Sequence, residues 1–379
     1  MNLSYVKRIC FLTSVHHAFD IRMFHKEAKT LKKAGYDVTL VAQHDKEEDV
    51  DGIRIVPLSK PKNRFVRMTR TVWAVYRKAL KIDADIYHLN DPELIPVGLL
   101  LKLFGKKIIY DMHENLPKQI KNKHWINSYC RDIISVSVHW AERFLLFDIP
   151  IIFAEISYHK DYLWVKNYTT ILNMPLIYQL RAIKKEFPKS EKLVIGYIGG
   201  LSEERGSLTT IEMLRILKGR GVEPRFECIG AADKPHEKKL LKLCEEYKLN
   251  NVVFHWQMPA HSGWSIIAQC CIGLAVLHPI PNYIESYPTK MFEYMALGLP
   301  VIASDFPLWR EIVEGAGCGL LVNPLNPAKI ADAVIYLLEN PEEAEEMGKN
   351  GRRAVYEKYN WEMEEKKLLE FYIKVLQMA

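Results

Sequence analysis

Two glutamates and one lysine in the second half of the chain have the types and the spacing to bind a ligand that carries both phosphate and hydroxyl groups. Glu285 and Glu293 are separated by seven residues, and Lys290 lies between them in the segment 285–305, ESYPTKMFEYMALGLPVIASD. The lysine supplies a full positive charge for a phosphate. A carboxylate beside a phosphate would repel it, so Glu293 is better suited to accept hydrogen bonds from hydroxyl groups, as a carboxylate does for a ribose.

The elements expected around these residues are a loop, a short helix, a turn and a buried strand. The helix is expected over residues 289–297, opened by Pro288 or Thr289. Its first N–H groups and the positive end of its dipole favour an anion next to Lys290. Glu293 lies one turn further along the same face. An ordinary surface ion pair between Lys290 and Glu293 is the alternative, because pairs at this spacing are common.

This segment resembles the signature of the family 4 glycosyltransferases, which have the GT-B fold. The signature is two glutamates separated by seven residues and a run of the form E-x-M-A-x-G-x-P-V-I-A-S, which EYMALGLPVIAS at 293–304 matches without a break. The resemblance covers most of the chain, most strongly residues 195–324, and the YPTK form resembles the branch that builds bacterial surface polysaccharides. It implies an α/β protein with two Rossmann-like domains that face each other across a cleft. It also implies that Glu285 meets the donor sugar and that Glu293 binds the ribose of the nucleotide.

A glycine-rich turn at 199–206 is the second part of the predicted donor site. Gly199 and Gly200 follow an expected strand and allow a ligand to approach the backbone closely. The resemblance implies that Arg205 binds the pyrophosphate, and its planar guanidinium can grip two phosphate oxygens at once. Many relatives carry an arginine where Gly200 stands, and many carry an uncharged residue at the position of Lys290, so the chain departs from the family pattern at both positions.

The resemblance also places the loop after the expected strand 252–255 beside the nucleobase. Gln257 is expected to offer hydrogen bonds there, and Trp256 either forms an apolar wall or packs in the core. The predicted nucleotide-sugar site therefore comprises Gly199, Gly200, Arg205, Gln257, Glu285, Pro288, Thr289, Lys290 and Glu293. We assign catalytic roles to Glu285, Arg205 and Lys290 within this set, because negative charge grows on the diphosphate as it leaves.

The first half of the chain has a β-α-β pattern with polar residues after its strands. A strand over 8–13, a helix over 22–34 and a strand over 38–42 predict a parallel sheet with ligand-binding loops at the carboxyl ends. Asp20 and Arg22 follow the first strand and are expected to face the ligand cleft, the alternative being a helix-capping aspartate and a solvated arginine.

Two further strands of the first half also end in polar residues. Asn90 follows a strand at 85–88, and His113 and Glu114 follow a strand at 107–110. The resemblance implies that His113 approaches the donor sugar, and we therefore count it among the catalytic residues. Asp20, Arg22, Asn90 and Glu114 form the predicted acceptor side of the site.

Positive charge is concentrated in the first half of the chain. The net charge is +6 over 379 residues, but residues 1–175 hold 27 basic against 19 acidic side chains. Within residues 60–81 there are eight basic and no acidic side chains, interleaved with aromatic and aliphatic ones, a pattern typical of helices that lie on an anionic membrane surface. A helix that packs on the sheet and exposes a solvated basic face is the alternative. Nucleic acid is disfavoured as a partner, because no recognised nucleic-acid motif accompanies the charge.

The remaining features predict a cytoplasmic enzyme that needs no metal or cofactor. The seven cysteines are scattered without a CxxC pair, and no run of 18 apolar residues occurs. Two Asp-x-Asp pairs, at 49–51 and 83–85, precede strands and are read as solvated turns, so no metal site is predicted. The expected location is the cytoplasm, with peripheral contact at the inner face of the membrane.

The expected division is an acceptor-binding domain at 1–172, a nucleotide-sugar-binding domain at 173–359 and a closing helix at 360–379 that returns to the first domain. The expected reaction is retaining transfer of a hexose-type sugar from a nucleotide-diphosphate sugar to a saccharide or lipid-linked acceptor, in the synthesis of cell-surface polysaccharide. Two alternatives remain at this stage: a nucleotide-sugar epimerase on the same fold, and a non-catalytic subunit that acts as a scaffold.

Overall fold

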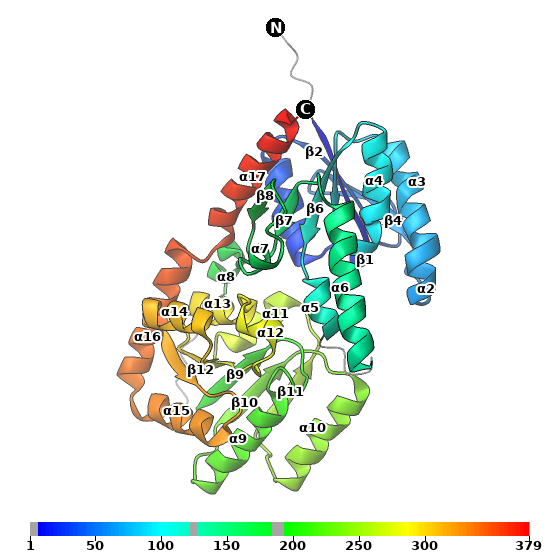
Figure 1. The fold of residues 1–379 in the computed structure, drawn as a ribbon. Coiled ribbons are helices and arrows are strands. Elements are labelled where there is room, and N and C mark those ends of the chain that lie inside the picture. The colour runs from blue at the N-terminus through cyan, green and yellow to red at the C-terminus, as the bar shows by residue number, and fades with distance from the viewer. Residues whose placement is uncertain (1–6, 122–126, 184–192, 379) are drawn as a thin grey trace. The chain divides into compact units, whose positions relative to one another are not determined.

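The chain folds into two compact units, each built on its own sheet. The computed structural model describes residues 7–121, 127–183 and 193–378. Unit 1 comprises Met1–Asn173 and Met363–Ala379, and unit 2 comprises Met174–Glu362. Each unit is an α/β layer structure, and Figure 1 shows the two sheets with helices packed against them.

The described part of unit 1 forms an eight-stranded sheet in the order β3-β4-β2-β1-β5-β6-β7-β8. Every neighbouring pair is parallel except β3 with β4. The chain therefore crosses over between most neighbours, which places the loops after β1, β5 and β6 together at one edge of the sheet. The strands are β1 (Arg8–His17), β2 (Asp37–Gln43), β3 (Glu48–Val50), β4 (Ile53–Leu58), β5 (Ile86–Leu89), β6 (Lys107–Met112), β7 (Ile151–Phe153) and β8 (Tyr168–Thr170).

The helices of unit 1 cover its sheet with apolar faces. In α3, Val75 and Ala79 are fully buried and pack in one core cluster with strand residues such as Leu12 and Tyr87. Among the described residues no helix is both long and apolar enough to cross a membrane. The helices are η1 (Ile21–Ala28), α1 (Lys29–Lys33), α2 (Arg64–Val66), η2 (Arg67–Thr71), α3 (Val72–Ile82), η3 (Pro92–Leu94), α4 (Ile95–Leu103), α5 (Leu116–Lys121), α6 (Ser128–Leu145) and α7 (Tyr158–Asp161).

The last helix, α17 (Trp361–Gln377), begins at the end of unit 2 and completes unit 1. The Tyr372 hydroxyl lies 2.6 Å from Nδ1 of His88 on β5, and Glu364 accepts a hydrogen bond of 2.9 Å from the backbone N–H of Leu172. Both Tyr372 and His88 are fully buried, so the side chains of α17 form part of the interior of unit 1.

Unit 2 has a six-stranded sheet, parallel throughout its described strands, in the order β11-β10-β9-β12-β13-β14. The strands are β9 (Val194–Ile198), β10 (Arg225–Ile229), β11 (Val252–Trp256), β12 (Ile272–Ala275), β13 (Val301–Ser304) and β14 (Gly319–Val322). The helices are α8 (Ile177–Arg181), α9 (Ser207–Gly219), α10 (Lys234–Glu246), α11 (Ala260–Ile267), α12 (Pro281–Ile284), α13 (Thr289–Ala296), α14 (Pro307–Ala316), α15 (Pro327–Glu339) and α16 (Pro341–Glu357).

The helix predicted over 289–297 is α13, and the turn that follows it is the predicted one. Gly298 has a φ of +73°, the left-handed conformation that ends many helices. Buried side chains of α13, including Met291, Phe292 and Met295, anchor this short helix in unit 2. Its first residue, Thr289, is thereby held at a fixed place near the carboxyl ends of the strands.

Candidate active site

In unit 2, the glycine turn after β9 and the first turn of α13 come together at the carboxyl edge of the sheet. A Cβ atom added to Gly199 would lie 3.0 Å from Nζ of Lys290 and 3.9 Å from Nη1 of Arg205. Gly199 has a φ of +132°, so both its conformation and this close approach favour glycine at the position. The structure therefore brings together three of the residues that the sequence predicted for phosphate binding.

Lys290 is buried without a hydrogen-bond acceptor among the described residues. Only 6% of the residue is exposed, and Nζ lies 3.8 Å from the ring centroid of Tyr197. Burial, and next to it the positive charge of Arg205, lower the pKa of Lys290 well below its ordinary value of 10.5, while Glu293 acts in the opposite direction. A buried ammonium that lacks an acceptor is costly, and an anionic ligand would supply one.

The predicted residues of segment 285–293 are placed near this lysine by the chain. Pro288 caps α13, which leaves the N–H groups of Thr289 and Lys290 at its amino end. Glu285 directly follows α12, and Glu293 lies one turn after Lys290; both glutamates are half-buried. The positive end of the helix, the Lys290 side chain and the Glu293 carboxylate are therefore near one another, as expected for a ligand with phosphate and hydroxyl groups.

Arg205 is held at the end of the glycine turn by the local backbone. Its N–H donates to the Ser202 carbonyl at 3.2 Å, and its guanidinium lies 5.7 Å from the ring of Tyr283. Gly206 follows with a φ of +74°, and a Cβ there would lie 2.0 Å from the backbone oxygen of Val276. Only glycine therefore allows α9 to begin directly after Arg205.

Gln257 lies at the end of a different strand from these groups. It is exposed and follows the edge strand β11, two strands away from β9. Trp256 before it has a φ of +52°, uncommon for a large side chain, and its ring stacks on Phe254 at 5.0 Å with an interplanar angle of 12°. Tryptophan at this place therefore has a packing partner, and Gln257 is presented to solvent on a bent strand end.

The predicted residues of unit 1 divide into those at the surface of its carboxyl edge and those beneath it. The His113 side chain is 22% exposed, and its Nε2 lies 2.9 Å from Oδ2 of Asp111. Glu114 is exposed beside it. Asn90 is only 4% exposed, and its amide nitrogen lies 3.4 Å from the same Nε2 of His113.

Two predicted acceptor residues, Arg22 and Asp20, make contacts within unit 1. Arg22 was expected to face the ligand, and this is wrong: it is 4% exposed and holds the buried Asp111 carboxylate with two hydrogen bonds, of 3.0 and 3.1 Å. Asp20 accepts hydrogen bonds of 2.9 Å from the N–H groups of Arg22 and Met23, which is the capping role left open as the alternative. A buried carboxylate needs a charged partner, which explains why Arg22 turns inward.

Several groups at these edges carry no local signal in the sequence. Asp91 is 3% exposed and accepts hydrogen bonds from the Thr13 hydroxyl at 2.8 Å and from the Ser14 N–H at 2.6 Å. It thereby fixes the loop after β1, in which Nε2 of His16 lies 3.5 Å from its other oxygen. In unit 2, Tyr197 reads as an ordinary core residue of a strand. Only its place directly before the glycine turn could have drawn attention to it.

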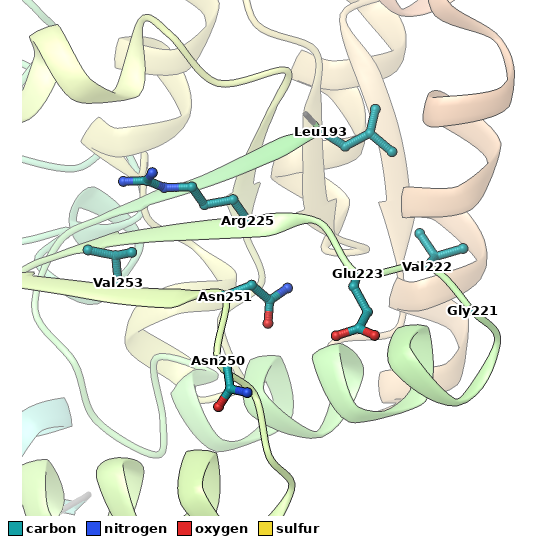
Figure 2. Close-up of a pocket in the computed structure, with 8 residues that line it drawn as sticks. All are labelled: Leu193, Gly221, Val222, Glu223, Arg225, Asn250, Asn251 and Val253. Carbon is teal, nitrogen blue, oxygen red and sulfur yellow. The ribbon is translucent and has the colours of Figure 1, made fainter. Parts of the chain in front are cut away.

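A separate hollow of about 600 Å³ lies at the opposite end of the unit 2 sheet. Figure 2 shows the residues that line it, at the amino ends of β9, β10 and β11: Leu193, Gly221, Val222, Glu223, Arg225, Asn250, Asn251 and Val253. Arg225, its cationic residue, is paired with Glu227. Open parallel sheets bind ligands at the carboxyl ends of their strands, so this hollow is not the candidate active site.

Two family models match most of the chain between them. Residues 22–163 match the model described as "Glycosyltransferase Family 4", and residues 179–354 match "Glycosyl transferases group 1". The chain belongs to the family 4 glycosyltransferases. These matches confirm the family predicted from the two glutamates and the run that follows them, and the two α/β units with their parallel sheets are those of the GT-B fold.

Individual relatives of this family are similar over parts of the chain. An alpha-D-kanosaminyltransferase of Streptomyces kanamyceticus is 26% identical over 178 residues, which are 47% of this chain and 45% of the relative. A putative colanic acid biosynthesis glycosyltransferase of Salmonella typhimurium is 30% identical over 134 residues, 35% of this chain and 32% of that one. The chain therefore spans less than half of the length of either relative.

Solved structures of the same fold match over nearly the whole chain. Sucrose-phosphate synthase from Thermosynechococcus elongatus has a TM-score of 0.78 at 19% identity, covering 98% of this chain and 100% of that one. HepE of Anabaena in complex with UDP-glucose has a TM-score of 0.72 at 15% identity, covering 97% and 99%. At these identities the likeness concerns the fold.

Proposed function

We propose that this glycosyltransferase moves a hexose-type sugar from a nucleotide-diphosphate sugar to a saccharide or lipid-linked acceptor, with retention of the anomeric configuration and without a metal ion. The observation that carries the proposal is the buried Lys290 ammonium, which has no hydrogen-bond acceptor among the described residues and points at the Gly199 turn beside Arg205. A diphosphate bound there would pair both cations at once.

In the proposed reaction, unit 2 stabilises the leaving group. As the bond between the sugar and the diphosphate breaks, negative charge grows on the phosphate oxygens. Arg205, Lys290 and the first N–H groups of α13 are fixed before the reaction, so they stabilise this charge without reorganisation. Glu293 would accept hydrogen bonds from the ribose, and Glu285 from the donor sugar. An acceptor hydroxyl, bound by unit 1, would then attack the anomeric carbon from the face on which the diphosphate leaves, and its proton would pass to an oxygen of the departing diphosphate.

Thermal-shift measurements with UDP-, GDP-, ADP- and dTDP-sugars test the donor. A ligand that binds only the folded protein stabilises it, by about 2.7 kcal/mol when the free ligand concentration is a hundred times Kd, and so raises the melting temperature. The donor found in this way is then used in hydrolysis and transfer assays of the wild type and of Glu293→Ala. Transfer that is lost in the variant supports the proposal, whereas a protein that binds none of the four nucleotides is better explained as a scaffold.

We further propose a role in cell-surface polysaccharide synthesis at the inner face of the cytoplasmic membrane. The support is the basic segment 60–81. In α3, Val75 and Ala79 face the core, while the neighbouring side chains Phe65, Met68 and Trp73 are 77%, 54% and 59% exposed. Exposed aromatic and aliphatic groups among basic ones suit an anionic lipid surface, because the apolar groups insert while the cations meet the headgroups. The same helix packs on the sheet, so both readings of the segment apply together.

Sedimentation with liposomes of anionic lipid at low salt tests this contact. The wild type should pellet with the liposomes, and Trp73→Ser should pellet less. Leu241→Ser, which changes a 45% exposed side chain of unit 2, is the matched control and should behave as the wild type. A wild type that stays in the supernatant at low salt would remove the membrane role and leave the transfer reaction untouched.

A further inference from the structure

We infer that Asp111 and Arg22 are positioning residues that hold the His113 imidazole in one orientation and join it to the segment through which the chain leaves unit 1. The inference rests on the glycosyl transfer proposed above, because it concerns a residue expected beside the donor sugar. Asp111 and Arg22 lie beneath the edge of the sheet and are not exposed enough to touch a substrate.

The Asp111 carboxylate holds the ring of His113 through a close ion-pair contact. Asp111 is the second-last residue of β6 and is fully buried, and its Oδ2 lies 2.9 Å from Nε2 of His113. Burial alone would raise the pKa of Asp111, but Arg22 and then His113 outweigh burial and hold it well below its ordinary value. An ionised carboxylate only accepts hydrogen bonds, and its oxygen is closer to Nε2 than the amide nitrogen of Asn90 is, so we place the proton on Nε2. Nδ1 then remains for a ligand at the partly exposed side of the ring.

Arg22 binds Asp111 and also the segment that ends at Asn173, where the chain first passes from unit 1 to unit 2. Its Nε and Nη2 bind the two oxygens of Asp111, and its Nη1 donates to the backbone oxygen of Ile171 at 2.9 Å. Ile171 lies two residues before the end of the first segment of unit 1 at Asn173. Nearby, Lys26 donates to the side chain of Asn173 at 2.5 Å. A displacement of this segment would therefore move Arg22 and Asp111, and with them the ring of His113.

A second chain of contacts reaches Asp111 from the closing helix. The Tyr372 hydroxyl of α17 lies 2.6 Å from Nδ1 of His88, and Nε2 of His88 lies 3.5 Å from Oδ2 of Asp111. Ile171 precedes the first point at which the chain passes between its units, and Tyr372 follows the second. Both residues are thus connected by side-chain contacts to the Asp111 carboxylate. His113, whose side chain is 22% exposed, lies at the carboxyl-edge end of these contacts.

The buried cluster of Glu27, His88 and Asp111 does not require a metal ion. Glu27, His88 and Asp111 lie close enough to share a cation. However, Nε of Arg22 lies 3.0 Å from an oxygen of both Glu27 and Asp111 and occupies the position between them. Burial, with a further contribution from the Asp111 charge, raises the pKa of Glu27 well above its ordinary value, which favours the neutral form of this carboxyl. The guanidinium and one carboxylate then form a balanced pair.

A double-mutant cycle distinguishes positioning from a general structural role. Asp111→Asn keeps the size of the side chain and removes its charge. We expect kcat to fall about 100-fold, as for misplacement of a group at the reacting centre, with the donor KM changed by less than about threefold. In a His113→Ala background the same substitution should lower kcat by less than about threefold further. An equal loss in both backgrounds, or no loss in either, would overturn the inference.

A nitrogen-15 NMR measurement tests the orientation without any turnover. In protein labelled at histidine, the signals of His113 are assigned by their loss in His113→Ala. The wild type should show a proton on Nε2, and Asp111→Asn should shift both ring nitrogens as the two tautomers mix. Unchanged ring signals would refute the positioning role. If the wild type is active and Asp111→Asn leaves the ring signals unchanged, only this inference is refuted. If the wild type is inactive and Asp111→Asn shifts the ring signals, only the transfer reaction is refuted.

Arg22→Lys provides a second variant if Asp111→Asn does not fold. It keeps the charge but loses the planar pair of donors and the third donor to Ile171. We expect kcat to fall about tenfold and the His113 ring signals to shift in the same direction as in Asp111→Asn. Wild-type kcat and wild-type ring signals in this variant would contradict the connection between the crossing segment and His113.

Discussion

Replacing Lys290 by methionine is expected to stabilise the free protein and to weaken nucleotide binding at the same time. Methionine has a similar length and no charge, so the contact with the Tyr197 ring is kept while the buried ammonium disappears. A buried donor without an acceptor costs about 1–3 kcal/mol. For a domain of this size each kcal/mol corresponds to about 2–4 °C, so the melting temperature of the free protein should rise by about 2–12 °C.

The loss in binding follows from the same geometry with the opposite sign. A hydrogen bond between an ammonium and a phosphate oxygen contributes about 1.5–3 kcal/mol. Its removal should therefore weaken the binding of the donor or of its nucleoside diphosphate by about 10- to 150-fold. Titration calorimetry measures the affinity, and scanning fluorimetry measures the melting temperature with and without the nucleotide.

The pH dependence gives an independent check of the sign. Burial and the neighbouring Arg205 lower the pKa of Lys290 in the folded protein, while the unfolded chain keeps a value near 10.5. Between these two values the unfolded state binds more protons, so the free wild type gains stability as the pH rises toward about 10.5. Lys290→Met should lack this gain.

The matched control is Lys234→Met, a lysine in α10 whose side chain is 84% exposed. It should change stability by no more than about 0.5 kcal/mol and leave nucleotide binding unchanged. A free Lys290→Met protein that melts several degrees below the wild type would refute the reasoning, because Lys290 would then be a paired structural residue. Equal nucleotide affinities of Lys290→Met and the wild type would refute its role in binding.

Three further predictions concern stability. Gly206→Ala should destabilise the protein by more than about 3 kcal/mol in urea unfolding, because its Cβ would meet a backbone oxygen at 2.0 Å. The control is Gly315→Ala in α14, where a Cβ meets no described atom within 4 Å, and this variant should gain about 0.5–1 kcal/mol of stability. A Gly206→Ala protein of wild-type stability would contradict the described turn. Burial raises the pKa of Glu142 to about 7, so the wild type loses stability as the pH rises from about 4.5 to about 8. The free energy of unfolding of Glu142→Gln should exceed that of the wild type by about 1–3 kcal/mol at pH 8 but not at pH 4.5. The same difference between variant and wild type at both pH values would disprove this. Arg22→Met should cost about 3–5 kcal/mol by leaving the Asp111 carboxylate buried without a cation, and a loss below about 1 kcal/mol would show that the pair is dispensable.

The local structure around Lys290 was predictable because it depends on residues that are adjacent in the sequence. The helix at 289–297, its glycine stop at Gly298 and the turn at Gly199 each follow from a few adjacent residues. Lys290 and Arg205 were assigned to the same ligand, and the structure brings both near Gly199. What could not be predicted is how deeply Lys290 is buried, since its burial depends on Tyr197 of strand β9.

The network in unit 1 was not predictable, because its partners are distant in sequence. Arg22 and Asp111 are separated by 89 residues, and His88 and Tyr372 by 284. An arginine two residues after a capping aspartate reads locally as a solvated side chain. Only the sheet order, which places β6 two strands away from β1, brings a buried carboxylate under Arg22.

The place of α17 also has a consequence for the order in which the protein folds during synthesis. All the strands of unit 2 and the helices α8–α16 leave the ribosome before Tyr372 does, whereas the interior of unit 1 stays incomplete until Tyr372 reaches His88. Unit 2 can therefore reach its native packing first, as a continuous segment, while Met1–Asn173 still exposes part of its core. A nascent chain stopped before residue 363 should then combine a protease-resistant unit 2 with a protease-sensitive unit 1. Residues made after unit 2 would thus determine when the earlier segment of unit 1 becomes stable.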